Sequence, residues 1–177
     1  MSTLYLALGS NLGDRIAYLN LARDTVARWP VTTLRRASRV YETAPVGPPG
    51  QGPYLNQVLE LTTDLTPRDA LSEAKRLEAA AHRTPTPPGT WEARTLDVDL
   101  LIHDDLIVDD DDLTLPHPRL HERPFVLAPL AELAPDRVHP VLHRTVAQLL
   151  EAVGHEGILT ILDGCRSRAS SDAGGTR

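Results

Sequence analysis

Apolar and polar residues follow two different periods in the first third of the chain. Residues 4–9 form a short apolar run closed by Gly-Ser-Asn, which predicts a buried strand that ends in a turn. Over residues 14–29 apolar positions recur every three or four residues until Pro30, which predicts a helix with one face on a sheet. Residues 33–43 and 54–63 are rich in β-branched and aromatic side chains, so each predicts a strand.

The remaining pattern predicts a second helix, a fourth strand and a C-terminal extension. The helix begins after Thr66, whose hydroxyl can cap the first turn, and continues to about residue 82. Residues 95–102 are too few and too rich in β-formers for a helix, so they predict a strand. The later expected elements are a hairpin over 106–115 turning at the aspartates 109–112, a helix over 124–133 and a helix over 145–153 ended by Gly154.

The order strand, helix, strand, strand, helix, strand is typical of a ferredoxin-like α+β fold. In that arrangement two helices cover one face of an antiparallel sheet, and we expect the other face to be left free for a ligand. The C-terminal hairpin and helices would be added to this βαββαβ unit. Residues 1–164 are expected to form a single domain, and the small, polar residues 165–177 are expected to be a disordered tail.

Composition narrows the classes of function. The 177 residues carry a formal net charge of −6, so we expect no nucleic-acid partner, because such binding depends on neutralising phosphates. The single cysteine, Cys165, cannot form an internal disulfide. The first residues lack the pattern of a signal peptide, and no apolar run approaches the ~20 residues that span a bilayer. We therefore expect a soluble cytoplasmic protein with no membrane partner.

Two aspartates in the segment RTLDVDLLI are the first candidate chemistry. Strand side chains alternate between faces, so Asp97 and Asp99 should project together while Leu96, Val98 and Leu100 enter the core. Two carboxylates ~7 Å apart at their Cα atoms can both reach one ion, and Mg²⁺ takes such oxygen ligands together with substrate phosphates. The tripeptide Asp-x-Asp also occurs on solvated strand faces, so the pair alone leaves both alternatives open.

Basic and aromatic residues supply the other two candidate groups. Arg83, Arg94, His117 and Arg123 are suitable donors for a polyphosphate whose charge must be spread during transfer. Every other histidine is expected at the surface or at a helix end: His82, His103, His121, His139, His143 and His155.

A flat heterocycle could be held by aromatic residues near the proline-glycine loop. Tyr54 opens a strand, and Asn56, two residues later, should lie on the same face. Together with Phe125 they would stack a ring and read its polar edge with an amide. Ordinary core packing remains the alternative for Phe125.

Five blocks of the sequence, taken in order and spacing, resemble the 6-hydroxymethyl-7,8-dihydropterin pyrophosphokinase family. They are LALGSNLGDR with the residues before it, YETAPVG, QGPYLNQVLEL, WEARTLDVDLLI and LPHPRLHERPFVLAPLAELAP, and together they span roughly residues 3–155. The resemblance implies a ferredoxin-like fold and an enzyme that moves pyrophosphate from ATP to the hydroxymethyl group of the pterin, releasing AMP, in folate biosynthesis. It also implies Mg²⁺ as cofactor, with two ions, and a monomer whose partners are these small molecules.

The resemblance further implies a role for each matching residue. Asp97 and Asp99 would hold the metal and, with Arg83 and Arg94, carry the catalysis. The residues implied at the ATP site are Glu78, Arg83, Arg94, Leu100, Thr114, His117 and Arg123. The residues implied at the pterin site are Thr43, Pro45, Val46, Tyr54, Asn56, Trp91, Asp97 and Phe125.

The chain departs from the family pattern between Arg83 and Trp91, where TPTPPGT replaces further basic residues, and after Trp91, where Glu92 and Ala93 replace Gly-Pro. Fewer phosphate donors and three prolines predict weaker ATP binding or slower closure of this loop. Two alternative functions stay open on this ground: a pyrophosphokinase or related phosphotransferase acting on a different pterin, and a catalytically silent module that binds pterin or nucleotide.

Overall fold

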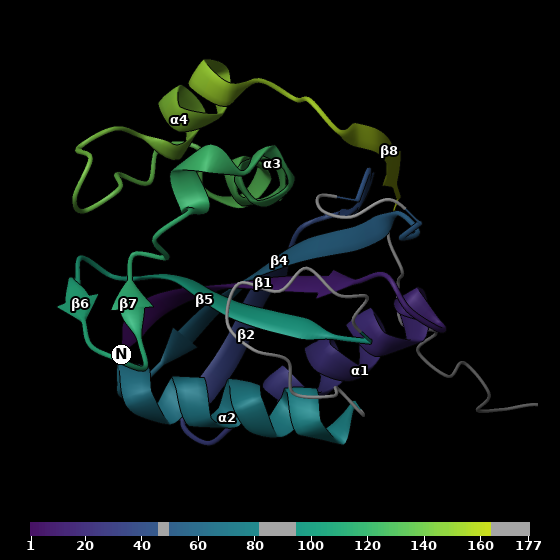
Figure 1. The fold of residues 1–177 in the computed structure, drawn as a ribbon. Helices are drawn as coiled ribbons and strands as arrows, with labels where there is room; N and C mark the ends of the chain where they lie inside the picture. Colours follow the sequence, from purple (N-terminus) through teal and green to yellow (C-terminus); the bar gives the residue numbers. More distant parts are fainter. Residues whose placement is uncertain (46–49, 82–94, 164–177) are drawn as a thin grey trace, which may run out of the picture.

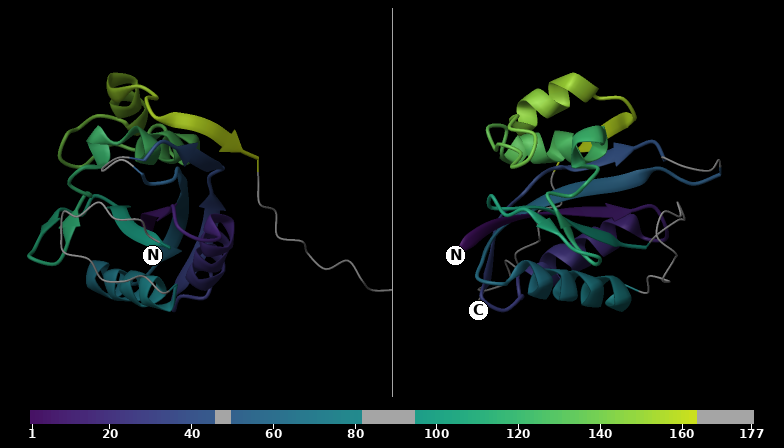
Figure 2. Two further views of the ribbon diagram at one scale, coloured as in Figure 1. Left: turned by 45° about the vertical axis from the view of Figure 1, so that its right-hand side comes forward. Right: turned by 60° about the vertical axis from the view of Figure 1, so that its left-hand side comes forward.

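A central antiparallel sheet separates two pairs of helices (Figure 1). The computed structural model describes residues 1–45, 50–81 and 95–163. Helices α1 (Arg15–Val26) and α2 (Pro67–Ala80) lie on one side of the sheet, and α3 (Pro124–Leu133) and α4 (Val146–Val153) lie on the other (Figures 1 and 2). The α+β class expected from the sequence is confirmed.

Three strands form the middle of the sheet and one of its edges. β1 (Ser2–Ser10) pairs antiparallel with β4 (Tyr54–Thr63) on one side and with β5 (Asp97–His103) on the other. The order along the sheet is β5-β1-β4-β3-β8, so β5 is an edge strand. All three strands lie where the hydrophobic pattern predicts them, because each supplies alternate apolar side chains to a buried face.

The single strand expected over residues 33–43 is wrong in one respect. It is divided into β2 (Thr32–Ala37) and β3 (Val40–Thr43), which both pair with β4. Ala37 pairs with Leu59 and Tyr41 with Asn56, so four residue steps oppose three and the strand bulges at Ser38 and Arg39. Ser38 keeps the bulge hydrogen-bonded, because its hydroxyl accepts from the Val58 N–H at 2.9 Å.

Helix α2 begins at the cap that the sequence predicts, and α1 begins at a similar cap that was not predicted. The Asp14 carboxylate accepts from the Ala17 N–H at 3.0 Å, and the Thr66 hydroxyl accepts from the Asp69 N–H at 3.2 Å. Helix α1 ends before the predicted limit at residue 29, because residues 27–28 form a turn. Helix α2 ends at Ala80 and residue 81 forms a turn, while the predicted limit at about residue 82 lies outside the described residues. Their buried residues meet Leu4, Leu6 and Leu8 of β1 in the larger hydrophobic core.

The expectation that the other face of the sheet is free is corrected by α3 and α4. Their apolar residues form a second core with Tyr5, Val58 and Ile102 of the sheet. α3 has an almost entirely buried sequence, VLAPL, which is typical of a helix enclosed on several sides. Among the described residues, the part of this face nearer to the end of β1 lies outside that core.

The C-terminal part adds elements that the sequence predicts and one that it does not. The expected hairpin is β6 (Val108–Asp109) with β7 (Thr114–Leu115), and a 3-10 turn over Leu120–Glu122 precedes α3. β8 (Ile158–Leu162) was not predicted, and it pairs with β3 as the second edge of the sheet. The expected tail over 165–177 lies outside the described residues. Among those described, no helix is both long and apolar enough to cross a bilayer.

Two histidines expected at the surface are buried. His103 is 1% exposed, with Nε2 at 2.6 Å from the Ser2 hydroxyl, and His139 is 4% exposed, with Nδ1 accepting from two backbone N–H groups. Burial lowers the pKa of both imidazoles below the usual value, and this effect is the largest for each. The folded protein therefore keeps both rings preferentially neutral.

This burial predicts a stability that depends on pH. Below the ordinary histidine pKa of about 6.5, the unfolded chain takes up protons that the folded rings resist, so the free energy of unfolding should fall. Each histidine contributes a slope of at most about 1.4 kcal/mol per pH unit. Urea unfolding of His103→Gln between pH 7.5 and 5.5 should show a smaller loss than wild type. The exposed His155→Gln variant is the matched control, and an unchanged slope in His103→Gln would contradict the prediction.

Candidate active site

Strand pairing places one residue from each of four strands in a row across the sheet. Gly9 of β1 pairs with Asp97 of β5 on one side and with Asn56 of β4 on the other, and Asn56 in turn pairs with Tyr41 of β3. In the next row Asp99 pairs with Ala7. Because side chains two residues apart share a face, Asp97, Asp99, Asn56 and their strand neighbours on this face form one surface.

The carboxylates of Asp97 and Asp99 lie on the same face of β5, as strand alternation predicts. Both residues are partly exposed, whereas Leu96, Val98 and Leu100 between and beside them are buried in the core under α1 and α2. In residues 1–45, 50–81 and 95–163, no group of three or more His, Cys, Asp or Glu side chains could hold a metal ion. A pair of carboxylates nevertheless fits Mg²⁺, which usually completes its ligands with water and substrate phosphates.

Glu78 of α2 reaches the open edge of the sheet beside this pair. Its Oε1 accepts from the Val98 N–H at 2.9 Å, so it occupies an outward-facing donor of edge strand β5 between the two aspartates in sequence. The resemblance placed Glu78 at the ATP site, and the structure brings it to the same strand as Asp97 and Asp99. A third carboxylate, from α2, thus lies at the outer edge of β5.

His117 and Arg123 approach Asp99 from the segment between β7 and α3. His117 Nε2 lies 3.7 Å and Arg123 Nη1 3.9 Å from Asp99 Oδ2. The His117 N–H donates to the Leu101 carbonyl at 2.8 Å, and its Nδ1 accepts from the Arg119 N–H at 3.1 Å. A neutral ring therefore carries its proton on Nε2, toward Asp99.

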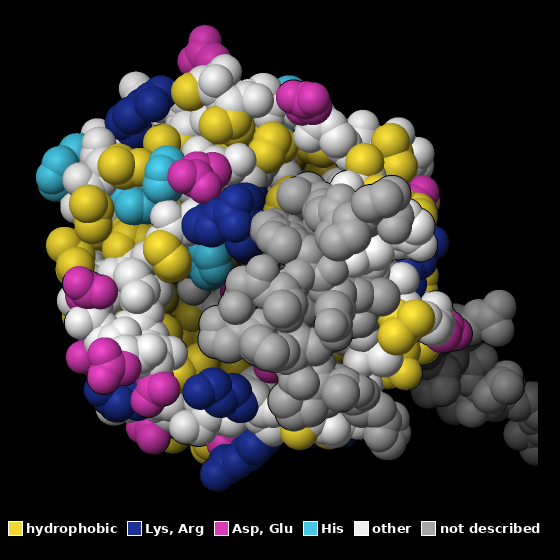
Figure 3. All heavy atoms as spheres, viewed as in Figure 1, with side chains coloured by type: hydrophobic (Ala, Val, Ile, Leu, Met, Phe, Trp, Pro, Cys, Tyr) yellow, Lys and Arg dark blue, Asp and Glu magenta, His cyan; other side chains and the backbone are white. Residues whose placement is uncertain are grey.

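Electrostatics keep His117 neutral in this structure. Burial lowers its pKa to about 4, and the nearby Arg123 guanidinium acts in the same direction. Its Nε2–H is then a fixed hydrogen-bond donor, and Arg123 supplies the positive charge. Figure 3 shows basic, acidic and histidine side chains gathered between α3 and β5 on the face it views.

The aromatic residues expected to stack a ring lie on two sides of this surface. Tyr54 opens β4 and reaches its hydroxyl to Gln51 Oε1 at 3.5 Å, while Asn11 donates to the same oxygen at 3.2 Å. Phe125 stands in the first turn of α3, with the Arg123 guanidinium 5.7 Å from its ring centre. Gln51 thus links Asn11 to Tyr54.

Thr43 and Asn56 form the polar edge between the aromatic residues. The Asn56 side-chain N–H donates to the Thr43 hydroxyl at 2.8 Å, and both side chains are buried. A cavity of about 390 Å³ adjoins Thr43 and is lined by Pro45, Phe125, charged residues of the segment before α3 and residues of the turn between α4 and β8. Of the residues expected at the pterin site, Thr43, Pro45, Tyr54, Asn56, Asp97 and Phe125 therefore lie near one another.

A salt bridge holds the start of β4 and the end of β3 against α1. Arg15 Nη1 donates to Glu42 Oε1 at 2.9 Å and to the Pro53 carbonyl at 2.8 Å. Arg15 belongs to the segment SNLGDR, which resembles a phosphate-binding turn in sequence. The structure gives this segment a bracing contact with the strand ends that carry Thr43 and Tyr54.

Two residues expected at the ATP site, Leu100 and Thr114, differ in their exposure. Leu100 is 3% exposed and packs in the core, so only its backbone could meet a ligand at the edge of β5. Thr114 is partly exposed on β7, beside β5. The other expected site residues, Val46, Arg83, Trp91 and Arg94, lie outside the described residues, as does the proline-rich segment between Arg83 and Trp91.

Gly9 is the residue of this surface that sequence reasoning missed. A Cβ atom at Gly9 would stand 3.5 Å from Asn56 Oδ1, 3.9 Å from Asp97 Cβ and 4.0 Å from Tyr54 Cδ1. The glycine thus leaves a shallow floor between the amide and the carboxylate. Its position at the end of the first apolar run was the only signal, and that signal equally fits a turn.

Known proteins with similar sequences identify the family. The sequence profile of 7,8-dihydro-6-hydroxymethylpterin-pyrophosphokinase (HPPK) matches residues 5–135. The 2-amino-4-hydroxy-6-hydroxymethyldihydropteridine pyrophosphokinase of Bacillus subtilis is 40% identical over 129 residues, which cover 73% of this chain and 76% of that protein. The protein of the same name from Haemophilus influenzae is 38% identical over 140 residues, which cover 79% of this chain and 86% of that one.

Solved structures agree on the fold. The wild-type HPPK-DHPS of Plasmodium falciparum with SDX-DHP matches with a TM-score of 0.65 at 14% identity, covering 86% of this chain. The match covers 43% of that longer chain, so this protein spans less than half of its length. The sequence matches to the profile and to both relatives extend over most of the chain. The chain therefore belongs to the 7,8-dihydro-6-hydroxymethylpterin-pyrophosphokinase family.

Proposed function

We propose that this enzyme transfers pyrophosphate from ATP to the hydroxymethyl group of 6-hydroxymethyl-7,8-dihydropterin and releases AMP, a step of folate biosynthesis. One observation carries the proposal beyond family membership. The row of paired residues Asp97, Gly9 and Asn56 joins a carboxylate pair to a polar edge that suits a pterin, with His117 and Arg123 beside Asp99. A phosphate donor and a flat acceptor would thus meet over one surface.

The donor side is assigned to residues at and around β5. Asp97 and Asp99 would hold Mg²⁺, proposed as two ions, which when bound would draw charge from the phosphates and orient them. Arg123 and the Nε2–H of His117 would hydrogen-bond the phosphate oxygens near Asp99. The proposed ATP site also includes Glu78, Leu100, Thr114, Arg83 and Arg94.

The acceptor side is assigned to the surface between Tyr54 and Phe125. The two rings would stack the pterin, and the polar edge formed by Thr43 and Asn56 would read its amide and amino groups. Val46, Pro45 and Trp91 complete the proposed pterin site. The floor at Gly9 lets the heterocycle approach the backbone between Asn56 and Asp97.

In the proposed reaction the hydroxymethyl oxygen attacks the β-phosphorus in line with the bond that breaks. A new oxygen–phosphorus bond forms, and the bond from the β-phosphorus to the bridging oxygen breaks, so that oxygen and its electron pair leave on AMP. Asp97 shares its row with Asn56 of the acceptor side, so it is the carboxylate placed to accept the hydroxyl proton. Positioning and charge neutralisation supply most of the rate.

The proposed function also has a cellular compartment, an oligomeric state and a class of partners. It acts in the cytoplasm as a monomer on small molecules, without nucleic acid as a partner. A different pterin as acceptor remains the alternative suggested by the altered segment between Arg83 and Trp91. Turnover of a small set of pterins with ATP and Mg²⁺ separates the two, and pterin binding without AMP release would instead indicate a catalytically silent module.

Replacing the carboxylate nearest the acceptor tests the assignment directly. Asp97→Ala should lower turnover by ~100-fold or more, because it removes a metal ligand and the proton acceptor. AMP release in a coupled assay with 6-hydroxymethyl-7,8-dihydropterin measures it. Asp97 is partly exposed, so thermal unfolding should be close to wild type. Asp24→Ala, an exposed position in α1, is the control, and an active Asp97→Ala enzyme would overturn the assignment.

A methyl group at position 9 should weaken binding of the pterin acceptor more than binding of ATP. Gly9→Ala places its Cβ at ordinary contact distances from Asn56, Asp97 and Tyr54, so the fold should accept it. The same atom occupies space that the pterin needs, and we expect the acceptor KM to rise about tenfold. The ATP KM should change less than about twofold, since the new atom meets Asp97 at its Cβ, at 3.9 Å, rather than at its carboxylate. An unchanged acceptor KM would show that the pterin lies elsewhere.

A further inference from the structure

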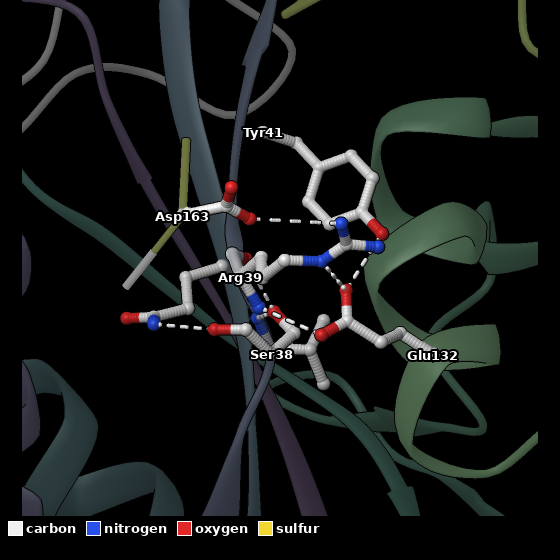
Figure 4. Close-up of polar contacts among 7 residues, drawn as sticks. Ser38, Arg39, Tyr41, Glu132 and Asp163 are labelled. Carbon is white, nitrogen blue, oxygen red and sulfur yellow. Dashed lines mark hydrogen bonds and ion pairs between the residues drawn. The ribbon is translucent and has the colours of Figure 1, made fainter. Parts of the chain in front are cut away.

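A second polar cluster lies where the last turn of α3 meets the bulge between β2 and β3. Glu132 Oε1 accepts from the Arg39 backbone N–H at 3.0 Å, and Oε2 accepts from the Tyr41 hydroxyl at 2.7 Å and from Arg39 Nε at 3.3 Å (Figure 4). One carboxylate thus receives three hydrogen bonds from the bulged strand. Tyr41 continues the row of paired residues beyond Asn56, and neither Arg39 nor Glu132 has a place among the residues assigned to either substrate.

Burial makes the contact between Tyr41 and Glu132 strong. Tyr41 is 4% exposed, so its hydroxyl needs a protein partner. Burial, and then the hydrogen bond to Glu132, raise the pKa of Tyr41 to about 12, so the phenol stays protonated and keeps donating at neutral pH. A hydrogen bond to a charged acceptor contributes more than one between neutral groups.

Two further contacts make this junction stiff. Arg36 of β2 donates through Nη2 to the Leu133 carbonyl at 2.7 Å, so the neighbouring strand also holds the end of α3. Within the bulge, the Ser38 carbonyl accepts from the Gln57 side chain at 2.7 Å. The end of α3 is therefore bound to strands that are themselves hydrogen-bonded to β4.

The same junction sets the distance across the proposed acceptor site. Tyr41 lies two residues before Thr43 on the same face of β3, and it pairs with Asn56. Phe125 lies on α3 two turns before Glu132, about 10 Å away along the helix axis. Pro129 removes one backbone hydrogen bond from α3, but Val126, Leu127 and Leu130 on both sides of it are buried together in the second core. The contact that fixes Glu132 to Tyr41 therefore also restrains Phe125 relative to Thr43 and Tyr54.

We propose that Tyr41 and Glu132 are positioning residues for the pterin acceptor, which act by holding α3 at the spacing that a single flat ring needs between Phe125 and Tyr54. Neither residue touches the acceptor. The inference rests on the proposed function, because it uses the assignment of Phe125 and Tyr54 as the stacking pair. The donor side depends mainly on β5 and His117, which lie outside α3, and it shares only Arg123 with the start of that helix, so it should be affected less.

Steady-state kinetics with both substrates varied test this inference. Tyr41→Phe removes one donor and keeps the ring, and Glu132→Ala removes all three contacts. Loss of a hydrogen bond to a charged group predicts an acceptor KM raised ~10-fold in Tyr41→Phe and more in Glu132→Ala. The KM for ATP with Mg²⁺ should stay within about twofold in both. In Glu132→Gln the carbonyl oxygen can still accept from Tyr41, so this variant should recover part of the acceptor affinity.

The controls separate positioning from loss of stability. Glu73→Ala breaks an ion pair with Arg76 on α2, away from both sides of the site, and should leave both KM values unchanged. Equal rises in both KM values in folded Tyr41→Phe, or an acceptor KM like that of wild type, would overturn the inference. Inactive wild-type enzyme with this acceptor would instead overturn the proposed function. If Glu132→Ala does not fold, Tyr41→Phe and Glu132→Gln decide the question.

Discussion

The pairing of β1 with both β4 and β5 is the constraint on which the rest of the site depends. Gly9 pairs with Asn56 on one side and with Asp97 on the other, so residues far apart in sequence stand in one row. A shift of one residue in the β1–β5 register would turn Asp97 and Asp99 into the core and Val98 out of it, and the same shift in the β1–β4 register would turn Asn56. The apolar residues of all three strands resist such a shift, because most of them are buried in the core under α1 and α2. The hydrophobic core thereby sets the geometry of the polar surface.

The fold has two hydrophobic cores, one on each face of the sheet, and they have different roles. The core under α1 and α2 stabilises the sheet, while the smaller core under α3 and α4 covers part of the opposite face. The second core brings Phe125 and Arg123 to the edge of the polar surface, since both lie at the start of α3. The hydrogen bonds of Glu132 to Arg39 and Tyr41 also orient α3 on the sheet, because hydrophobic contact alone is not directional.

Charge is distributed so that the carboxylates of the site are not isolated. Arg123 lies near Asp99, and burial keeps His117 neutral with its Nε2–H toward the same carboxylate. Glu78 is engaged by the Val98 N–H. Two like charges on one strand face are costly unless a cation stands near them. The arrangement suits a ligand that brings both metal and phosphate.

The sequence by itself determined the elements and much of the candidate surface, because those depend on local spacing. The helix cap at Thr66 and the shared face of Asp97 and Asp99 both follow from neighbours within a few residues. The family resemblance added the roles of residues that no local pattern assigns. The sequence profile and the identities above support membership in that family.

Only the tertiary structure decided what depends on contacts between distant residues. The bulge at Ser38, the pairing of β8 with β3, the burial of His103, and the packing of α3 and α4 on the second face each need a partner at least 20 residues away. The floor at Gly9 and the contact of Glu132 with Tyr41 belong to the same class. Local periodicity reports which side of an element is apolar, but it carries no information on which other element will meet that side.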